Sequence, residues 1–167
     1  MSDIQRTLVV LKPDTIGRSI VGEIISRFER AGLHVVAMKM VKPTKEFLYH
    51  HYENIGKMIS RRGQKTFDMT LDMMTKLPVI AMVLEGVESV EFVRKIVGAT
   101  EPKSAPAGTI RGDYAHMSFS YADGKSIGVP NLVHASGDLE EAKQEIPHWF
   151  NDNEIYSYDP LHSLFTR

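Results

Sequence analysis

Apolar and polar positions along the chain fall into two recurring patterns. Continuous apolar runs at 7–11, 34–41 and 78–84 predict strands that are buried on both faces. Between these runs, apolar residues recur every three or four positions, as in helices that pack one face on a sheet. The segments predicted to be helical in this way are 15–28, 44–52, 67–74, 89–97 and 139–146. This order of strands and helices predicts an α/β layer fold with one split β-α-β core.

Polar residues and glycines mark the ends of several predicted helices. Asp14 is the predicted N-cap of the first helix, and Gly32 is its predicted stop. Gly98 is the predicted C-cap of the helix at 89–97. Asp138 and Glu141 have the spacing of a capping pair at the start of the last helix.

Three segments are predicted to lie outside this pattern. The stretch 57–65 is basic, and we interpret it as a solvated helix end or loop. The stretch 100–112 is rich in Gly, Pro and Ala and predicts a loop. A hairpin is predicted beyond it, with strands at 115–121 and 127–133 joined by a turn at Asp123-Gly124.

Composition narrows the class of protein without identifying it. The chain has 167 residues, 43% hydrophobic and 25% charged, so we expect one globular domain over 1–167. It contains no cysteine, which excludes disulfide scaffolds, zinc fingers, iron–sulfur sites and thiol nucleophiles. The net charge of -1 argues against binding nucleic acid or anionic lipid through bulk charge. Since no apolar run is long enough for a membrane span or a signal segment, we expect a cytoplasmic protein with no membrane or nucleic-acid partner.

Common nucleotide and metal motifs do not fit this sequence. Gly124-Lys125-Ser126 has the end of a P-loop motif, but Phe119 stands where the first glycine must be. His50 and His51 are adjacent, so on a helix they point about 100° apart and do not share one metal ion. Arg111 lies near the end of the stretch 100–112, where it serves as an anion clamp or pairs with Asp113 or a helix end.

His134 is the strongest single candidate for chemistry. It lies at the end of a predicted strand, and small residues follow it before the last helix, so a ligand has room to approach. Glu145 lies eleven residues further on and is placed to accept a hydrogen bond from one imidazole nitrogen. The other nitrogen would then be the nucleophile.

Five segments in order along the chain resemble nucleoside diphosphate kinases. They are 7–14 (TLVVLKPD), His51-Tyr52, 82–86 (MVLEG), 98–114 (from GAT to GTIRGDY) and 131–136 (NLVHAS). The resemblance implies a ferredoxin-like βαββαβ core, an α+β sandwich in which helices cover a four-stranded antiparallel sheet. It also implies a ping-pong transfer of the γ-phosphoryl group from a nucleoside triphosphate, typically ATP, to a nucleoside diphosphate through a phosphohistidine, which maintains NTP pools.

The resemblance assigns roles residue by residue. His134 would attack through Nδ1, Glu145 would hold the ring, and Tyr52 and Ser136 would support it. The nucleotide-binding residues would be Lys12 at the phosphate and ribose, Asn131 at the ribose hydroxyl, and Arg94, Thr100 and Arg111 at the phosphates. Mg²⁺ would be bound through the nucleotide phosphates, with no metal ligand from the protein. Family members are typically homohexamers or homotetramers, so a homo-oligomer is expected.

The sequence also departs from the family pattern. The turn after the nucleophile reads His-Ala-Ser-Gly-Asp, which moves an acidic side chain one place to Asp138. The segments 53–77 and 116–130 are expanded, and we expect the second to be a lengthened hairpin. Phe67 is the nearest candidate for the residue that stacks on the base, which leaves base preference open.

Two other functions are compatible with the fold. The first is a catalytically silent nucleotide-binding or scaffold subunit, which would be free to lose His134. The second is an RNA-binding ferredoxin-like module, which would expose aromatic residues on its sheet and carry a basic face. The central strands read here as buried aliphatic segments, which disfavours RNA binding.

Overall fold

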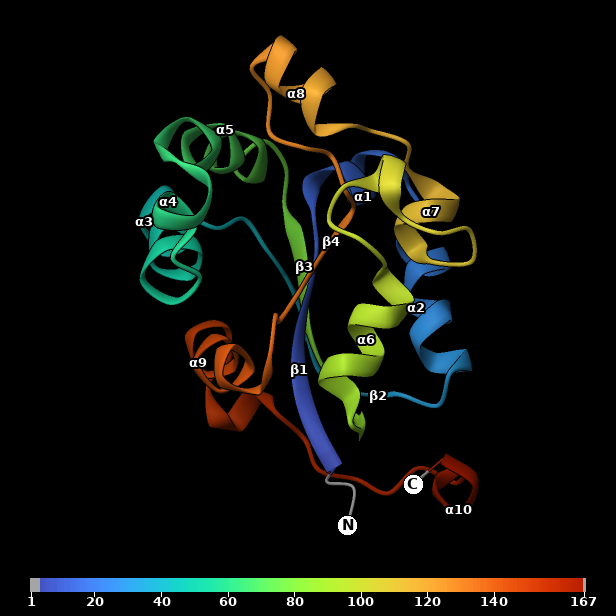
Figure 1. The fold of residues 1–167 in the computed structure, drawn as a ribbon. Coiled ribbons are helices and arrows are strands. Elements are labelled where there is room, and N and C mark those ends of the chain that lie inside the picture. The colour runs from blue at the N-terminus through green and yellow to red at the C-terminus, as the bar shows by residue number, and fades with distance from the viewer. Residues whose placement is uncertain (1–3, 167) are drawn as a thin grey trace.

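The computed structural model describes residues 4–166 and is built on one four-stranded sheet (Figure 1). The strands are β1 (Ile4–Leu11), β2 (His34–Val41), β3 (Val79–Val87) and β4 (Val133–Ala135). They are arranged in the order β2-β3-β1-β4, and every neighbouring pair is antiparallel. This confirms the expected ferredoxin-like βαββαβ core. The expectation that the chain has no signal segment concerns the N-terminal stretch, of which residues 1–3 lie outside the described residues.

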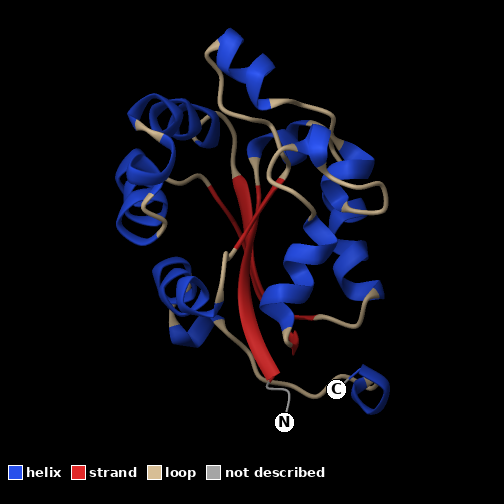
Figure 2. Ribbon diagram, in the orientation of Figure 1, coloured by secondary structure: helices blue, strands red, loops and turns tan. Residues whose placement is uncertain are grey.

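Helices cover both faces of the sheet, and Figure 2 shows the strands between two helical layers. One layer contains α3 (Lys45–Tyr49), the π-helix η1 (His50–Ile55), α4 (Met58–Arg62), α5 (Gln64–Met74) and α9 (Leu139–Trp149). The other contains α1 (Pro13–Gly17), α2 (Val21–Arg30), α6 (Ser89–Val97) and α7 (Ile110–Tyr114). The remaining helices are η2 (Pro102–Ser104), α8 (Phe119–Lys125), η3 (Asp152–Glu154) and α10 (Ser163–Thr166).

Strand β1 shows why an uninterrupted apolar run is needed at the centre of this sheet. Leu8 and Val10 pack in the core under α3, α5 and α9, whereas Val9 and Leu11 pack under α2 and α6. Because successive side chains of a strand point to opposite faces, one short run supplies both cores.

The predicted first helix is in fact two helices, α1 and α2. The break contains Ser19 in the left-handed region at φ 56°, so the apolar repeat crosses a turn rather than one continuous helix. Asp14 is not the N-cap, because Lys12 occupies that position. Asp14 instead accepts a hydrogen bond from the backbone N–H of Leu132, which ties α1 to the segment before β4.

The predicted hairpin at 115–133 is also wrong. Residues 119–125 form α8, and Ser118 caps it by accepting a hydrogen bond from the backbone N–H of Tyr121. Asp123-Gly124 therefore lies inside a helix, and Ser126 in the left-handed region ends it at φ 52°. Local capping outweighs the strand-like alternation here, because this segment lies beyond the sheet (Figure 1).

Other boundaries agree better with the sequence. Gly98 follows α6 with φ 86°, and Gly32 follows α2 with the same value, as expected for helix stops. Asp138 caps α9 by accepting a hydrogen bond from the N–H of Glu141. The predicted loop at 100–112 contains η2 and the start of α7. Within residues 4–166, no helix is long and apolar enough to cross a membrane.

Candidate active site

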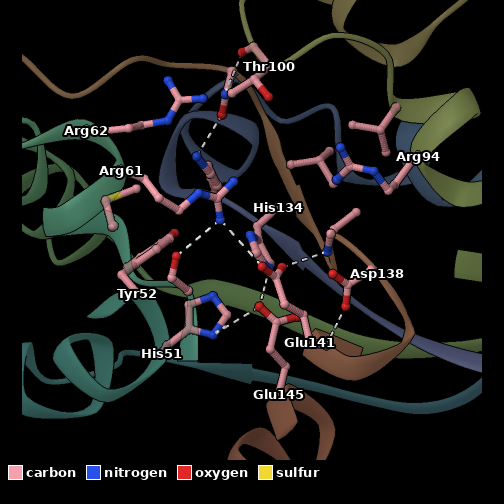
Figure 3. A pocket seen from close by; sticks show the side chains of 18 of the residues that line it. His51, Tyr52, Arg61, Arg62, Arg94, Thr100, His134, Asp138, Glu141 and Glu145 are labelled. Atoms are coloured by element: carbon pink, nitrogen blue, oxygen red, sulfur yellow. Dashed lines mark hydrogen bonds and ion pairs between the residues drawn. The ribbon is translucent and has the colours of Figure 1, made fainter. Parts of the chain in front are cut away.

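His134 is placed by the alternation of strand β4. Val133 and Ala135 face the core under α2 and α6, so the side chain between them points to the opposite face. There His134 meets η1 and α9 beside a cavity of about 300 Å³ (Figure 3). The side chain is partly exposed, which suits a group that must meet a substrate.

A short hydrogen-bonded chain fixes the His134 ring. Its Nε2 lies 2.8 Å from Glu145 Oε1, and the Ser136 hydroxyl donates to Glu145 Oε2 at 2.6 Å. Ser136 also accepts from the backbone N–H of Leu8, so the chain is anchored to the central strand. The contact confirms that Glu145 reaches the imidazole, and it shows that Ser136 supports the carboxylate rather than the ring.

Glu145 is ionised despite being 1% exposed. Burial on its own would raise its pKa, but the charge of His134 and the hydrogen bonds from His134 and Ser136 outweigh burial and lower the pKa to about 2. A carboxylate is acceptor-only, so the ring proton sits on Nε2 of His134. Nδ1 is then the nitrogen that is left to react.

The π-helix η1 brings two further side chains to the same place. His51 and Tyr52 are both buried there, although neighbours on an α-helix diverge widely. The His51 ring meets the His134 ring edge-on at 4.5 Å between centroids, and Trp149 Nε1 donates to His51 Nδ1 at 3.1 Å. Burial, with the nearby His134 charge, holds the pKa of His51 well below its usual range. His51 is therefore a neutral ring packed beside His134.

Tyr52 presents an unpaired hydroxyl to this site. Its Oη is buried and has no hydrogen-bond partner among residues 4–166, and burial raises its pKa, so the phenol keeps its proton. A buried donor without a partner is costly unless a ligand supplies one.

His51, His134 and Glu145 bring three metal-ligating atoms within 4.8 Å of one another. Hydrogen bonds already engage each of those side chains: Nε2 of His134 contacts Glu145, and His51 accepts from Trp149. This arrangement favours a hydrogen-bonded network over a metal centre.

The opposite end of the cavity is polar and cationic. Lys12 Nζ donates to Asn131 Oδ1 at 2.7 Å, and Asn131 Nδ2 donates to the carbonyl of Thr100 at 2.8 Å. Burial lowers the pKa of Lys12 to about 8, opposed by Asp14 and assisted by the cationic Arg111. The hydrogen bond to Asn131 therefore fixes the orientation of the Lys12 ammonium group. Because the residue is only 7% exposed, that group is weakly hydrated.

Arg111 is held almost entirely by backbone carbonyls. Its Nε donates to Asn131 O at 3.0 Å, its Nη1 to Gly98 O at 2.9 Å and its Nη2 to Val133 O. Burial, followed by the charge of Arg94, lowers its pKa to about 10. The guanidinium therefore fixes the ends of α6 and β4 while lending positive charge to the cavity, and it is not the partner of Asp113.

The structure brings the predicted site residues together from distant parts of the chain. Those that line the cavity are Lys12, Tyr52, Arg94, Thr100, Arg111, Asn131, His134 and Glu145, with Ser136 buried behind Glu145. Arg94 reaches it from α6 as an exposed cation. Phe67 does not belong to this set, because it is 2% exposed in the core and packs edge-on against Tyr49.

Several cavity residues were not singled out by the sequence. Arg61 and Arg62 reach it from α4, and Glu141 faces them from α9 (Figure 3). We interpreted the basic stretch as solvated, and both arginines are indeed exposed, yet they also line the cavity. The adjacent arginines Arg61 and Arg62 were the sequence signal for this part of the cavity. Their charge alone does not show which way the side chains point. His51 belongs to the His51-Tyr52 motif, from which the resemblance assigns it no role.

Comparison with known proteins gives consistent matches. A family model described as nucleoside diphosphate kinase matches residues 5–155. The nucleoside diphosphate kinase of Borreliella burgdorferi is 43% identical over 93% of this chain and 92% of its own length. That of Pyrococcus furiosus is 45% identical over 100% and 96%. A solved transition-state mimic of the Borrelia burgdorferi enzyme with vanadate and ADP has a TM-score of 0.94 at 40% identity, covering 98% of this chain and 96% of that one.

Proposed function

Because the chain belongs to the nucleoside diphosphate kinase family and moves phosphoryl groups between nucleotides, we propose that His134 carries the phosphoryl group in transit. The observation that carries this proposal is the 2.8 Å contact between Nε2 and Glu145, which leaves Nδ1 beside a cationic cavity. A neutral imidazole already has one nitrogen without a proton, so it needs no strong base before that nitrogen attacks.

The phosphoryl group is transferred in two half-reactions. The lone pair of His134 Nδ1 attacks the γ-phosphorus of a nucleoside triphosphate. The N–P bond forms as the bond to the β,γ-bridging oxygen breaks, and that oxygen leaves with the electron pair on the diphosphate. In the return half, a terminal oxygen of an acceptor diphosphate attacks the phosphorus, and the electron pair of the N–P bond returns to the imidazole.

Glu145 and the cavity cations lower the barrier in different ways. A phosphorylated ring that retains the Nε2 proton is positively charged, and the carboxylate of Glu145 stabilises it. Lys12, Arg94 and Arg111 face the negative charge that spreads over the phosphoryl oxygens. Tyr52 offers its unpaired hydroxyl to the same oxygens. Thr100 and Asn131 complete the nucleotide contacts at the phosphates and the ribose.

Mg²⁺ fits this site as an ion carried by the nucleotide. Lysine and arginine side chains outnumber carboxylates in the cavity lining, so oxygen ligands suited to Mg²⁺ come chiefly from the phosphates themselves. Asp138 and Glu141 are the carboxylates on its rim that would reach the waters of such an ion. When bound, Mg²⁺ neutralises charge on the phosphates.

We also propose broad base preference, self-association and a cytoplasmic location. The contacts assigned to this chain concern phosphate and ribose rather than the base. Apolar side chains stay exposed at Leu161, Leu164 and Phe165, as expected of surfaces that another subunit covers. A homohexamer or homotetramer is expected, and mass measurement in solution distinguishes the two from a monomer.

Labelling tests the proposed chemistry. After incubation with γ-labelled ATP and removal of nucleotide, the wild-type chain should hold an acid-labile, alkali-stable label. Adding GDP should move that label into GTP. His134→Ala should take up none. Absence of label on the wild type, or equal label on the variant, contradicts the phosphohistidine.

A further inference from the structure

Arg61 lines the same cavity as His134 and has no role in the proposed transfer. It belongs to α4, in the basic stretch at 57–65, and Figure 3 shows its guanidinium extending toward His134 and Glu141. Its Nη1 donates to the carbonyl of Gly56 at 3.1 Å and lies 3.4 Å from Glu141 Oε1. One terminal nitrogen thus makes both contacts.

The ion pair between Arg61 and Glu141 is easily exchanged. The two side chains are 61% and 24% exposed, and 3.4 Å is long for a charge-assisted bond. A phosphoryl group offers several oxygens and up to two negative charges to the same guanidinium, and such bidentate contacts are among the strong ones. An anion on His134 therefore competes well with Glu141 for Arg61.

Two of the other cavity cations are more firmly engaged. Lys12 donates to Asn131, and Arg111 donates to three backbone carbonyls. Arg62, next to Arg61, lies with its guanidinium carbon 5.4 Å from the centre of the Phe119 ring on α8. Arg61, also on α4, pairs instead with Glu141, a carboxylate that itself lines the cavity.

A second hydrogen bond holds the Glu141 carboxylate in place if its ion pair with Arg61 breaks. Its second oxygen, Oε2, accepts from the backbone N–H of Gly137 at 2.9 Å, in the turn that follows the nucleophile. The backbone N–H of Glu141 is in turn bound by Asp138. The carboxylate is therefore fixed to the turn, whereas Arg61 is a long side chain that is mostly exposed.

We propose that Arg61 is a further phosphoryl-binding residue. It breaks its ion pair with Glu141, contacts the phosphoryl group on His134 and so stabilises the phosphorylated enzyme. In the nucleotide-free enzyme, Glu141 neutralises Arg61. After transfer, when the diphosphate has left, Arg61 faces the dianion that remains. The inference rests on the proposed phosphohistidine and adds a residue that the family resemblance did not assign.

The equilibrium constant for phosphorylation tests the inference. Full-length enzyme is mixed with labelled ATP and ADP at fixed ratios, and the phosphorylated fraction is measured after equilibration. Arg61→Gln should shift the equilibrium toward the unphosphorylated enzyme by at least about fivefold. Arg61→Lys should recover part of the shift. Lys65→Gln, an exposed neighbour outside the cavity with the same change of charge, should leave it unchanged.

A double-mutant cycle tests the exchange of partners. If Glu141 competes for Arg61, the effect of Arg61→Gln should be larger in a Glu141→Gln background, whose amide oxygen still accepts from Gly137. Equal effects in both backgrounds would overturn the exchange. An equilibrium constant that Arg61→Gln leaves unchanged would overturn the inference, even if loss of the Gly56 contact slowed turnover. Failure of the wild type to take up label would instead contradict the proposed function.

Discussion

Nε2 of His134 lies 2.8 Å from Oε1 of Glu145, and this contact joins strand β4 to helix α9 across the floor of the cavity. It determines which imidazole nitrogen carries the proton and which one reacts. It also places a buried negative charge behind a ring that becomes positive on phosphorylation. In the proposed mechanism, this one contact sets both the direction and the energetics of attack.

Removing the charge of Glu145 should slow transfer without loosening nucleotide binding. We expect Glu145→Gln to lower kcat by about tenfold or more, with little change in KM for ADP, because the carboxylate stabilises the transition state rather than the bound nucleotide. Steady-state kinetics measures both constants. Glu140→Gln removes an exposed charge from the same helix and should behave as wild type. Equal kcat in the two variants would contradict the role of Glu145.

Activity should fall at alkaline pH through Lys12. Burial lowers the pKa of Lys12 to about 8, so its positive charge is present below that pH and is lost as the pH rises through it. We expect kcat/KM for ATP to decline above about pH 8. Lys12→Arg keeps its charge and should remove this decline while lowering activity overall. A decline of the same shape in Lys12→Arg would assign it to another group.

Stability at acid pH should depend on Glu145. Its pKa is about 2 in the folded chain, against an ordinary value of 4.5. A lowered pKa contributes stability that is present above the unfolded value and is lost as the pH falls from about 4.5 toward 2. Denaturant unfolding should therefore show a smaller loss of free energy of unfolding for Glu145→Gln than for the wild type over this window. Parallel losses would show that His134 and Ser136 do not stabilise the carboxylate.

Helix α8 depends on its N-cap. Ser118 accepts a hydrogen bond from the N–H of Tyr121, so Ser118→Ala should weaken the local structure by about 1 kcal/mol. Amide hydrogen exchange should become about fivefold faster in α8. Ser60→Ala, at an exposed position in α4, should leave α8 exchange unchanged. Unchanged exchange in Ser118→Ala would contradict the cap.

The sequence predicted most of the sheet because buried strands leave an unmistakable apolar signature. It failed at 119–125, where alternating residues belong to a capped helix that packs beyond the sheet. Spacing alone predicted a hydrogen bond between His134 and Glu145, because both belong to one strand–turn–helix unit. The cations come from four separate segments, and family resemblance predicted the convergence of only three of them, Lys12, Arg94 and Arg111. The His51-Tyr52 motif gave no sign that His51 packs beside His134, because a π-helix turns His51 inward beside Tyr52.

We expect Nδ1 of His134 to be the phosphorylated atom, because Glu145 engages Nε2. The most direct measurement is nuclear magnetic resonance of the phosphoenzyme labelled with ¹⁵N in histidine, in which coupling between phosphorus and nitrogen identifies the bonded atom. We predict coupling to Nδ1 of His134, and no such signal in His134→Ala. Phosphorus bonded to Nε2 of His134, or to another residue, would contradict the account.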